Sequence, residues 1–231
     1  MKVVIISGGH VEDTFALGWL QNNKYDKLIA VDSGMNFLFR NGLKPDIIAG
    51  DFDSVNQDAY EYFAGNENTT TCNASTRDGQ EAGKPEILRL NPIKDDTDTE
   101  FAIREAIRRG ATRITILGGT GTRLDHVLGN VHLLGIGLDL GVAIELVDAH
   151  NRIRIIDSEI TLGKDEQFGQ FVSLLPFAGN VKGVTLEGFK YPLTDYTIES
   201  FCSLGISNEI ENEKATVRLK EGLLLMIESR D

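Results

Sequence analysis

The sequence predicts an α/β domain with a mostly parallel sheet, followed by a smaller all-β domain. The first observation is that short apolar runs alternate with helical patterns over residues 1–147, which indicates parallel strands covered by helices. The second is that short strand-like segments follow one another after about Asp148, separated by glycines and turn residues, which is typical of a sandwich or barrel. We therefore expect two domains, residues 1–148 and 149–231, in a chain long enough to bury a real core.

The first domain has clear apolar runs and one well-marked helix. Its predicted strands are Val3–Ser7, Leu28–Asp32, Asp46–Ala49, Ile87–Leu90, Ile114–Leu117 and Ala143–Val147. A helix is expected at Thr99–Arg109, because Thr97 and Glu100 can form a capping box and Gly110 is a good stop. Apolar residues recur at helical spacing over residues 124–134, which predicts a second helix.

A polar insertion separates the two parts of this pattern. Residues 64–86 are rich in Gly, Asn and Thr, so we expect a long, mobile surface loop with no visible chemistry. In the second domain the predicted strands are Arg152–Ile156, Phe171–Leu175, Val181–Glu187, Thr216–Leu219 and Leu223–Ile227.

Composition narrows the class of protein. The net charge of −12 argues against a protein that coats DNA or RNA, because phosphate backbones need clustered Lys and Arg. The N-terminal stretch MKVVIISGGH has an apolar run too short for a signal-peptide core, and no stretch approaches the length of a membrane helix. Cys72 and Cys202 lack metal-ligand spacing and are interpreted as free thiols. We expect a cytoplasmic protein.

Two aspartates follow a buried run in the stretch IIAGDFDSV. If the chain stays extended past Gly50, Asp51 and Asp53 lie on one side and Phe52 on the other. Two nearby carboxylates stay ionised only with a cation between them or with good solvation. The stretch is therefore either part of a metal site or a solvated turn that caps the next helix.

Further acidic residues follow other predicted strands. An open α/β sheet gathers ligand residues at the carboxyl ends of its strands, where we expect Asp32, Asp51, Asp53, Asp95, Asp98 and Asp125. Taken singly, KDDTD can be an ordinary acidic helix start, GGTGTR a flexible turn, Arg123 a surface charge and His126 a packed or capping histidine. Taken together, carboxylates suited to Mg²⁺, a glycine-rich turn before a helix and one arginine favour phosphoryl-type transfer.

Six motifs in order carry a resemblance to a known family: DSGMN, KPDIIAGDFDS, KDDTDTE, GGTGTRLDHVLGN, GFKYPL and LGISNE. Together they resemble thiamine pyrophosphokinase over the whole chain apart from the insertion. The resemblance implies a Rossmann-like N-terminal domain and a C-terminal β-sandwich, in a homodimer with active sites shared between subunits. It implies transfer of the terminal pyrophosphate of ATP to the hydroxyl of thiamine, giving thiamine diphosphate and AMP.

The resemblance also implies roles for individual residues. The implied ligands of Mg²⁺ are Asp51, Asp53 and Asp98, with Asp95 nearby. The implied nucleotide contacts are Asp32, Asn36, Thr97, Arg123 and His126. Arg123 would stabilise charge in the transition state, and Asp125 would lie near the thiamine hydroxyl or the metal. Ser207 and Asn208 would contact the thiamine pyrimidine from the partner subunit. The chain departs from the family in Ser33, where glycine is common, and in its insertion.

Two other functions stay open on the sequence alone. One is a different Mg²⁺-dependent enzyme, such as a phosphatase or glycosyltransferase, since both can use an Asp-x-Asp motif. An aspartyl phosphatase carries that motif on its first strand. The first predicted strand of this chain ends in Ser7-Gly8-Gly9 instead, which counts against a phosphatase. The other is a catalytically inactive nucleotide or thiamine sensor, against which the intact acidic set counts.

Overall fold

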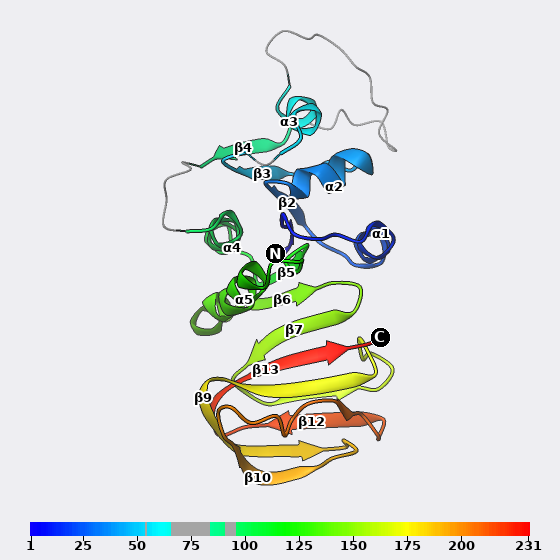
Figure 1. Cartoon of the computed structure of the whole chain (residues 1–231), viewed down its shortest axis with the longest axis vertical. Coiled ribbons are helices and arrows are strands. Elements are labelled where there is room, and N and C mark those ends of the chain that lie inside the picture. The colour runs from blue at the N-terminus through cyan, green and yellow to red at the C-terminus, as the bar shows by residue number, and fades with distance from the viewer. Residues whose placement is uncertain (54, 66–83, 91–95) are drawn as a thin grey trace. The chain divides into compact units, whose positions relative to one another are not determined.

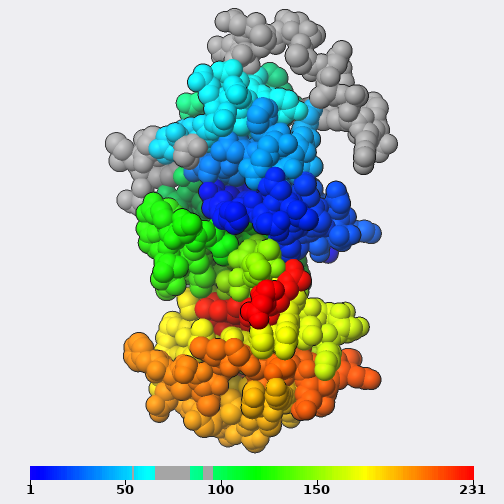
Figure 2. Space-filling view, turned by 45° about the vertical axis from the view of Figure 1, so that its right-hand side comes forward, coloured from blue at the N-terminus to red at the C-terminus, as the bar shows by residue number. Residues whose placement is uncertain are grey.

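The computed structural model describes residues 1–53, 55–65, 84–90 and 96–231. Within these residues the chain divides into two compact units, Met1–Asn130 and Val131–Asp231, which Figures 1 and 2 show from two directions. Most of the predicted loop, Cys72 and the candidate ligand Asp95 lie outside the described residues. The domain boundary at residue 148 stays a prediction.

The first unit is a parallel sheet in the strand order β4-β3-β2-β1-β5. Its strands are β1 (Lys2–Ile6), β2 (Lys27–Val31), β3 (Ile47–Gly50), β4 (Glu86–Arg89) and β5 (Arg113–Leu117). Each predicted strand of this sheet is confirmed to within about one residue at either end. Strands β1, β2, β3 and β5 are buried almost along their length, whereas the edge strand β4 is largely exposed.

Helices cover both faces of this sheet. The helices of this part of the chain are α1 (Asp13–Asn22), α2 (Gly34–Arg40), α3 (Gln57–Ala64), α4 (Asp98–Arg108) and α5 (Leu124–Leu133). The last of them crosses the boundary between the two units. Figure 1 shows α1 and α2 on one side of the sheet and α4 on the other, as right-handed crossovers require. None of the described helices combines the length and the apolar character needed to cross a lipid bilayer.

Helix α4 begins and ends as the sequence predicts. The hydroxyl of Thr97 accepts a hydrogen bond from the backbone N–H of Glu100 at 3.2 Å, which satisfies one donor of the first turn. At the other end Gly110 has a φ of 90°, and its N–H donates to the carbonyl of Ile107 at 2.8 Å. The buried side of the helix, Ala102, Ile103 and Ala106, packs on the sheet.

The chain order of the sheet reverses between β1 and β5, which are neighbours although far apart in sequence. A ligand crevice is expected outside the carboxyl ends of the strands at such a point. The loops that follow these two strands are bound to each other, because Gly9 N–H donates to Gly118 O at 2.8 Å and His10 N–H to Thr120 O at 2.7 Å. A Cβ at Gly9 would lie 2.3 Å from Thr120 O, so only glycine allows this close approach.

The second unit consists of antiparallel strands in the order β6-β7-β13-β9-β12-β8, with β10 and β11 also paired to β9. The 3₁₀ helix η1 (Leu134–Leu140) precedes them. The strands are β6 (Ala143–Val147), β7 (Asn151–Ile156), β8 (Ile160–Gly163), β9 (Phe171–Glu187), β10 (Leu193–Ile198), β11 (Asn208–Glu209), β12 (Lys214–Arg218) and β13 (Glu221–Ser229). Sequence reasoning missed β8, β10 and β11, whose mostly polar or short segments give no clear alternation.

The two strands predicted at Phe171–Leu175 and Val181–Glu187 are one strand, β9. Its first part pairs with β13 and its last part with β10 and β12, so the strand passes from one layer to the other. Ala178 and Gly179 have φ values of 61° and 136°, which bends the backbone without ending the strand. Buried side chains from both layers form one core between them, as in a β-sandwich.

An ionic cluster closes one end of this core. Glu228 has 0% side-chain exposure and lies in the same row of β13 as the buried Leu224 and Met226. Its carboxylate pairs with Arg152 and Arg154, each at 2.5 Å, and accepts a hydrogen bond from the backbone of Phe168 at 3.2 Å. Burial raises the pKa of Glu228, but the hydrogen bond from Arg152 and the charge of Arg154 outweigh it and hold that pKa below its usual value.

We predict that Glu228→Gln lowers the free energy of unfolding by about 2–4 kcal/mol at pH 7, because two partly buried guanidinium groups lose their counter-charge. The control is Glu221→Gln on the same strand, whose exposed carboxylate pairs with Lys182 and whose loss is worth under about 0.5 kcal/mol. Urea unfolding measures both. Equal effects of the two changes would contradict the assignment.

The same cluster gives a pH dependence. A carboxyl whose folded pKa is lowered stabilises the protein above its unfolded pKa, and this stability is lost as the pH falls through the folded value. Wild-type protein should therefore lose more stability than Glu228→Gln as the pH drops below about 4.

Candidate active site

Three carboxylates from separate elements meet at the carboxyl edge of the first unit. Asp32 follows β2, Asp51 follows β3 and Asp98 begins α4, and parallel strands end at one edge. The pKa of Asp32 is raised to about 7. Burial is the largest cause, followed by the hydrogen bond with Asp98 and by the charges of Asp98 and Asp51. The backbone N–H of Phe52 opposes this shift. The Asp32 carboxyl is therefore partly protonated near neutral pH.

The loop after β3 is a tight turn. The alternation of side chains expected for an extended chain past Gly50 therefore does not apply to Asp51, Phe52 and Asp53. Phe52 has a φ of 66°, and the N–H of Asp53 donates to Oδ1 of Asp51 at 3.1 Å. This side-chain bond replaces strand pairing and favours a turn. A Cβ at Gly50 would lie 1.9 Å from Oδ1 of Asp32, so glycine lets these two strand ends come together.

The donor set of this edge suits a hard divalent cation. Oδ1 of Asp32 is buried and has no hydrogen-bond partner among the described residues, and the neighbouring charges repel it. No group of three or more His, Cys, Asp or Glu side chains in the described part of the chain is arranged to hold a metal ion by itself. Mg²⁺ needs only one or two carboxylates, because waters and phosphate oxygens complete its shell. The carboxylates present could therefore hold a hard divalent cation only if other ligands complete its shell.

Other polar contacts hold the elements of this edge in place. The hydroxyls of Ser7, after β1, and Thr99, in the first turn of α4, share a buried hydrogen bond of 2.7 Å. Oδ1 of Asn36 accepts from the backbone N–H of Asn56 at 3.1 Å, which connects α2 to the start of α3. The sequence analysis assigned no role to Ser7 and Thr99. Their positions, a hydroxyl at the end of a strand and another in the first turn of a helix, could have indicated this contact.

Arg123 and Asp125 form an ion pair of 2.6 Å between Nη2 and Oδ2, and their side chains are 69% and 65% exposed. The hydrogen bond from Arg123 lowers the pKa of Asp125. His126 is also exposed. Arg123 thus pairs with Asp125 at the start of α5, and its exposed guanidinium is accessible to an anionic ligand.

The two thiamine candidates lie in the second unit, and one is already engaged. Asn208 is 4% exposed; its Oδ1 accepts from Tyr191 N–H at 3.0 Å and its Nδ2 donates to Tyr191 O at 2.9 Å. It therefore binds the GFKYPL segment to the LGISNE segment. Ser207 has a φ of 57°, and its N–H donates to the hydroxyl of Ser173 at 3.0 Å.

Apolar side chains surround these two motifs on the surface. The large exposed ones in this region are Tyr191, Phe201, Leu204 and Ile206, and the segment around residue 200 lies on the surface in orange in Figure 2. Cys202 is an exposed free thiol, as predicted. Phe201 is completely exposed at a φ of 63°, a site that composition and spacing gave no reason to single out.

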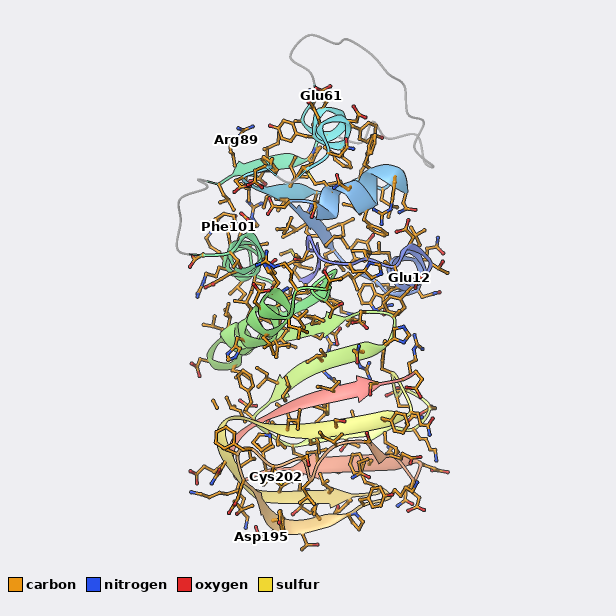
Figure 3. All side chains as sticks on the ribbon, in the orientation of Figure 1. Glu12, Glu61, Arg89, Phe101, Asp195 and Cys202 are labelled. Carbon is orange, nitrogen blue, oxygen red and sulfur yellow. The ribbon has the colours of Figure 1, made fainter. Side chains whose placement is uncertain are left out.

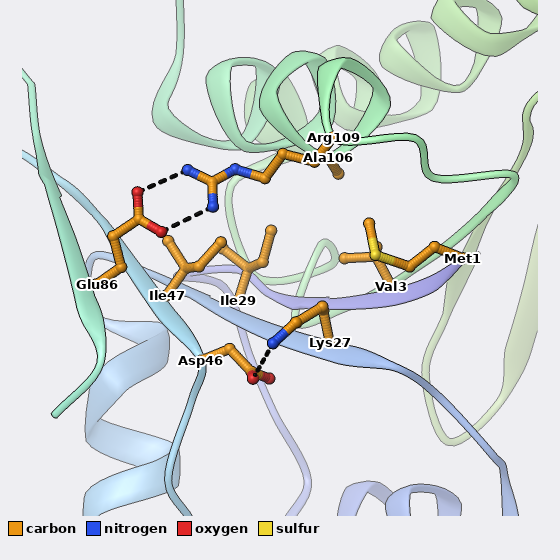
Figure 4. Close-up of a pocket in the computed structure, with 9 residues that line it drawn as sticks. All are labelled: Met1, Val3, Lys27, Ile29, Asp46, Ile47, Glu86, Ala106 and Arg109. Carbon is orange, nitrogen blue, oxygen red and sulfur yellow. Dashed lines mark hydrogen bonds and ion pairs between the residues drawn. The ribbon is translucent and has the colours of Figure 1, made fainter. Parts of the chain in front are cut away.

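A pocket of about 210 Å³ lies at the opposite, amino edge of the first sheet (Figure 4). Its lining includes the starts of β1, β2 and β4. Its charged groups are paired with one another, Arg109 with Glu86 and Lys27 with Asp46. This pocket lacks the repelling carboxylates of the carboxyl edge, and we assign it no part in the site.

Comparisons with known proteins agree with this geometry. Residues 20–146 match the model of the thiamin pyrophosphokinase catalytic domain, and residues 157–224 match that of its vitamin B1 binding domain. Thiamine pyrophosphokinase of Bacillus subtilis is 33% identical over 204 residues, which cover 88% of this chain and 87% of the relative.

Solved structures give the same answer for the fold. The crystal structure of thiamine pyrophosphokinase from Bacillus subtilis has a TM-score of 0.82 at 29% identity and covers 100% of both chains. That of thiamin pyrophosphokinase from Geobacillus thermodenitrificans has a TM-score of 0.80 at 31% identity and covers 100% of this chain and 98% of the other. With its catalytic and vitamin-binding portions both matched, the chain belongs to the thiamine pyrophosphokinase family.

Proposed function

We propose that this chain transfers the terminal pyrophosphate of ATP to the hydroxyl of thiamine, giving thiamine diphosphate and AMP. Membership of the family supports the reaction. The observation that carries it in this chain is the group of repelling carboxylates, Asp32, Asp51 and Asp98, at the carboxyl edge of the first sheet. Such a group is stabilised when a cation and a phosphate chain bind beside it.

The proposed metal ligands are Asp51, Asp53 and Asp98, with Asp95 nearby. Bound there with ATP, Mg²⁺ would supply charge neutralisation on the phosphate oxygens. Asp32 is partly buried, and its raised pKa lets it take up a proton when the site is empty. Thr97 and Ser7 keep the first turn of α4, and with it Asp98, in place at this edge.

The thiamine hydroxyl oxygen attacks the β-phosphorus and forms a bond to it, and the hydroxyl proton is released. The bond that breaks joins the β-phosphorus to the oxygen that bridges it to the α-phosphorus, and this oxygen leaves with AMP. We assign Arg123 to the phosphates, where its guanidinium stabilises charge that develops on that bridging oxygen. Asp125 orients the guanidinium through their ion pair. Asn36 and His126 are assigned to the nucleotide side of the site, on either side of the switch between β1 and β5.

We further propose a homodimer in which the second unit of one subunit supplies Ser207 and Asn208 to the thiamine site of the other. The exposed apolar side chains around these residues support a surface that is covered in an assembly. The cytoplasmic location stays a prediction.

Product analysis tests the reaction. Purified protein is incubated with ATP, Mg²⁺ and thiamine, and thiamine diphosphate and AMP should appear in equal amounts and vanish with a chelator. ADP with thiamine monophosphate would mean that a different phosphoryl transfer occurs. Thiamine binding without product would indicate an inactive sensor.

We predict that Asp51→Asn lowers kcat by at least about 100-fold, because a metal-binding carboxylate is lost, while the thermal midpoint stays within about 3 °C. Steady-state kinetics and a melting curve measure the two effects. The matched control is Asp58→Asn on the exposed start of α3, which should keep wild-type turnover. Wild-type activity in Asp51→Asn would remove the metal-site assignment.

We predict that, without metal or nucleotide, the free energy of unfolding falls as the pH rises from about 4 to 7. The pKa of Asp32 is raised from 3.8 to about 7, and a group with a raised folded pKa loses its stabilising contribution as the pH rises through that value. Asp32→Asn should therefore be more stable than wild type at pH 8 by on the order of 2 kcal/mol, and not at pH 4. The exposed Asp53→Asn serves as control; the same pH profile in wild type and Asp32→Asn would refute this prediction.

We predict that mixing two inactive variants restores activity. Asp51→Asn and Asn208→Ala damage different units, so a mixed dimer contains one intact shared site, and random exchange should give about one quarter of wild-type activity. Subunits are mixed after mild denaturation and refolding, with each variant refolded alone as control. A monomer with full activity in sedimentation experiments would contradict the shared site.

A further inference from the structure

Arg89 is the last residue of β4 and lies directly beside the loop that carries Asp51 and Asp53. It is aligned with Gly50 in the sheet, and the next residue, Leu90, donates its N–H to Gly50 O at 2.9 Å. Figure 3 shows Arg89 at the end of β4 on the exposed side of the first unit. Its backbone is thus fixed to the residue that precedes Asp51.

The guanidinium of Arg89 rests on two aromatic rings. Its central carbon lies 5.7 Å from the ring centroid of Phe52 and 5.8 Å from that of Tyr60. Nη2 donates to the Tyr60 hydroxyl at 2.6 Å, and the two rings are 5.1 Å apart. Planar guanidinium groups stack well on aromatic faces and are weakly hydrated. Arg89, Phe52 and Tyr60 therefore form one cluster, which we call the aromatic clamp.

The clamp acts on a residue in an unusual conformation. Phe52 has a φ of 66°, which is uncommon for a bulky side chain and persists only where the surroundings enforce it. This conformation allows Asp53 N–H to donate to Asp51 at 3.1 Å, and the backbone N–H of Phe52 interacts with Asp32. Asp51 and Asp53 therefore flank a turn whose central side chain is Phe52.

We propose that Arg89 is a positioning residue for the proposed transfer, holding the Asp51-Phe52-Asp53 turn in its binding conformation by clamping the Phe52 ring against Tyr60. The effect on turnover rests on the proposed function, whereas the clamp can be tested without any substrate. A different role, direct binding of a phosphate group by Arg89, predicts other kinetics and is separated below.

Amide exchange in the ligand-free protein tests the clamp. Arg89→Met keeps the length of the side chain but removes the guanidinium, and Tyr60→Phe removes only the hydroxyl. Exchange of the Asp53 amide should accelerate by about two- to fivefold in Arg89→Met, as loss of an exposed cation–π contact implies, and by less in Tyr60→Phe. Unchanged protection of this amide in Arg89→Met would overturn the proposal.

The matched control is Arg230→Met in the second unit. Its guanidinium stacks on the ring of Phe168 at 4.8 Å, so the change removes a similar contact away from the acidic turn. It should leave the exchange of Asp53 unaltered. Faster exchange of Asp53 in this control would show a general loss of stability and would count against the clamp.

Kinetics separate positioning from direct binding. Positioning predicts that Arg89→Met lowers kcat and raises the Mg²⁺ concentration for half-maximal rate by about fivefold or more, with the KM for thiamine unchanged. Tyr60→Phe should change both in the same direction, and Arg89→Lys should recover part of the loss. A raised KM for ATP at wild-type kcat, with Tyr60→Phe indistinguishable from wild type, would overturn positioning in favour of phosphate binding.

A binding measurement removes the dependence on turnover. Mn²⁺ is titrated in place of Mg²⁺ and the free ion is followed by electron paramagnetic resonance. The Kd for Mn²⁺ should rise by about fivefold or more in Arg89→Met and stay the same in Arg230→Met. If wild-type protein makes no thiamine diphosphate, the proposed function fails while the exchange experiment still decides on the clamp.

Discussion

The mutual repulsion of carboxylates at the carboxyl edge of the first sheet is the constraint on which the rest of that unit depends. Neighbouring carboxylates repel each other and would move apart if the backbone were free to shift. Several features of the fold prevent such a shift. Gly50 lets the ends of β2 and β3 approach, the Ser7–Thr99 bond fixes the start of α4, and Phe52 accepts a left-handed backbone. The fold is thus destabilised at this edge, and the proposed binding of a cation with phosphate would relieve the repulsion.

Much of the fold could be predicted because the signals were local. Most strands of the first sheet are buried apolar runs. The caps of α4 are set by Thr97 and Gly110, which act within a few residues. The meeting of Asp32, Asp51 and Asp98 also followed from the sequence, because the carboxyl ends of parallel strands share an edge whatever the details of the loops. The roles assigned to these residues stay predictions.

The features that escaped prediction depend on contacts distant in sequence or on backbone choices that composition does not reveal. The continuity of β9 through Ala178 and Gly179 depends on two different pairing partners, whereas glycine in a strand usually suggests an end. The turn at Phe52 is held by a hydrogen bond from the backbone N–H of Asp53 to the Asp51 carboxylate. The side-chain alternation of an extended strand therefore gave a wrong expectation there. The amide of Asn208 holds the backbone of Tyr191 from both sides, a contact between distant segments that only the folded chain shows.

The passage of β9 through both layers has a consequence for how the second unit folds. Residues 171–177 complete one layer and residues 181–187 the other, so neither layer can dissolve while the other keeps its strand intact. We therefore expect the two layers to unfold together, because each shares part of β9 with the other. Because β11, which begins with Asn208, is paired to this same strand, the segment assigned to the vitamin has the rigidity of the whole sandwich. Local opening of this segment should therefore cost more free energy than opening of a surface loop that pairs with no strand.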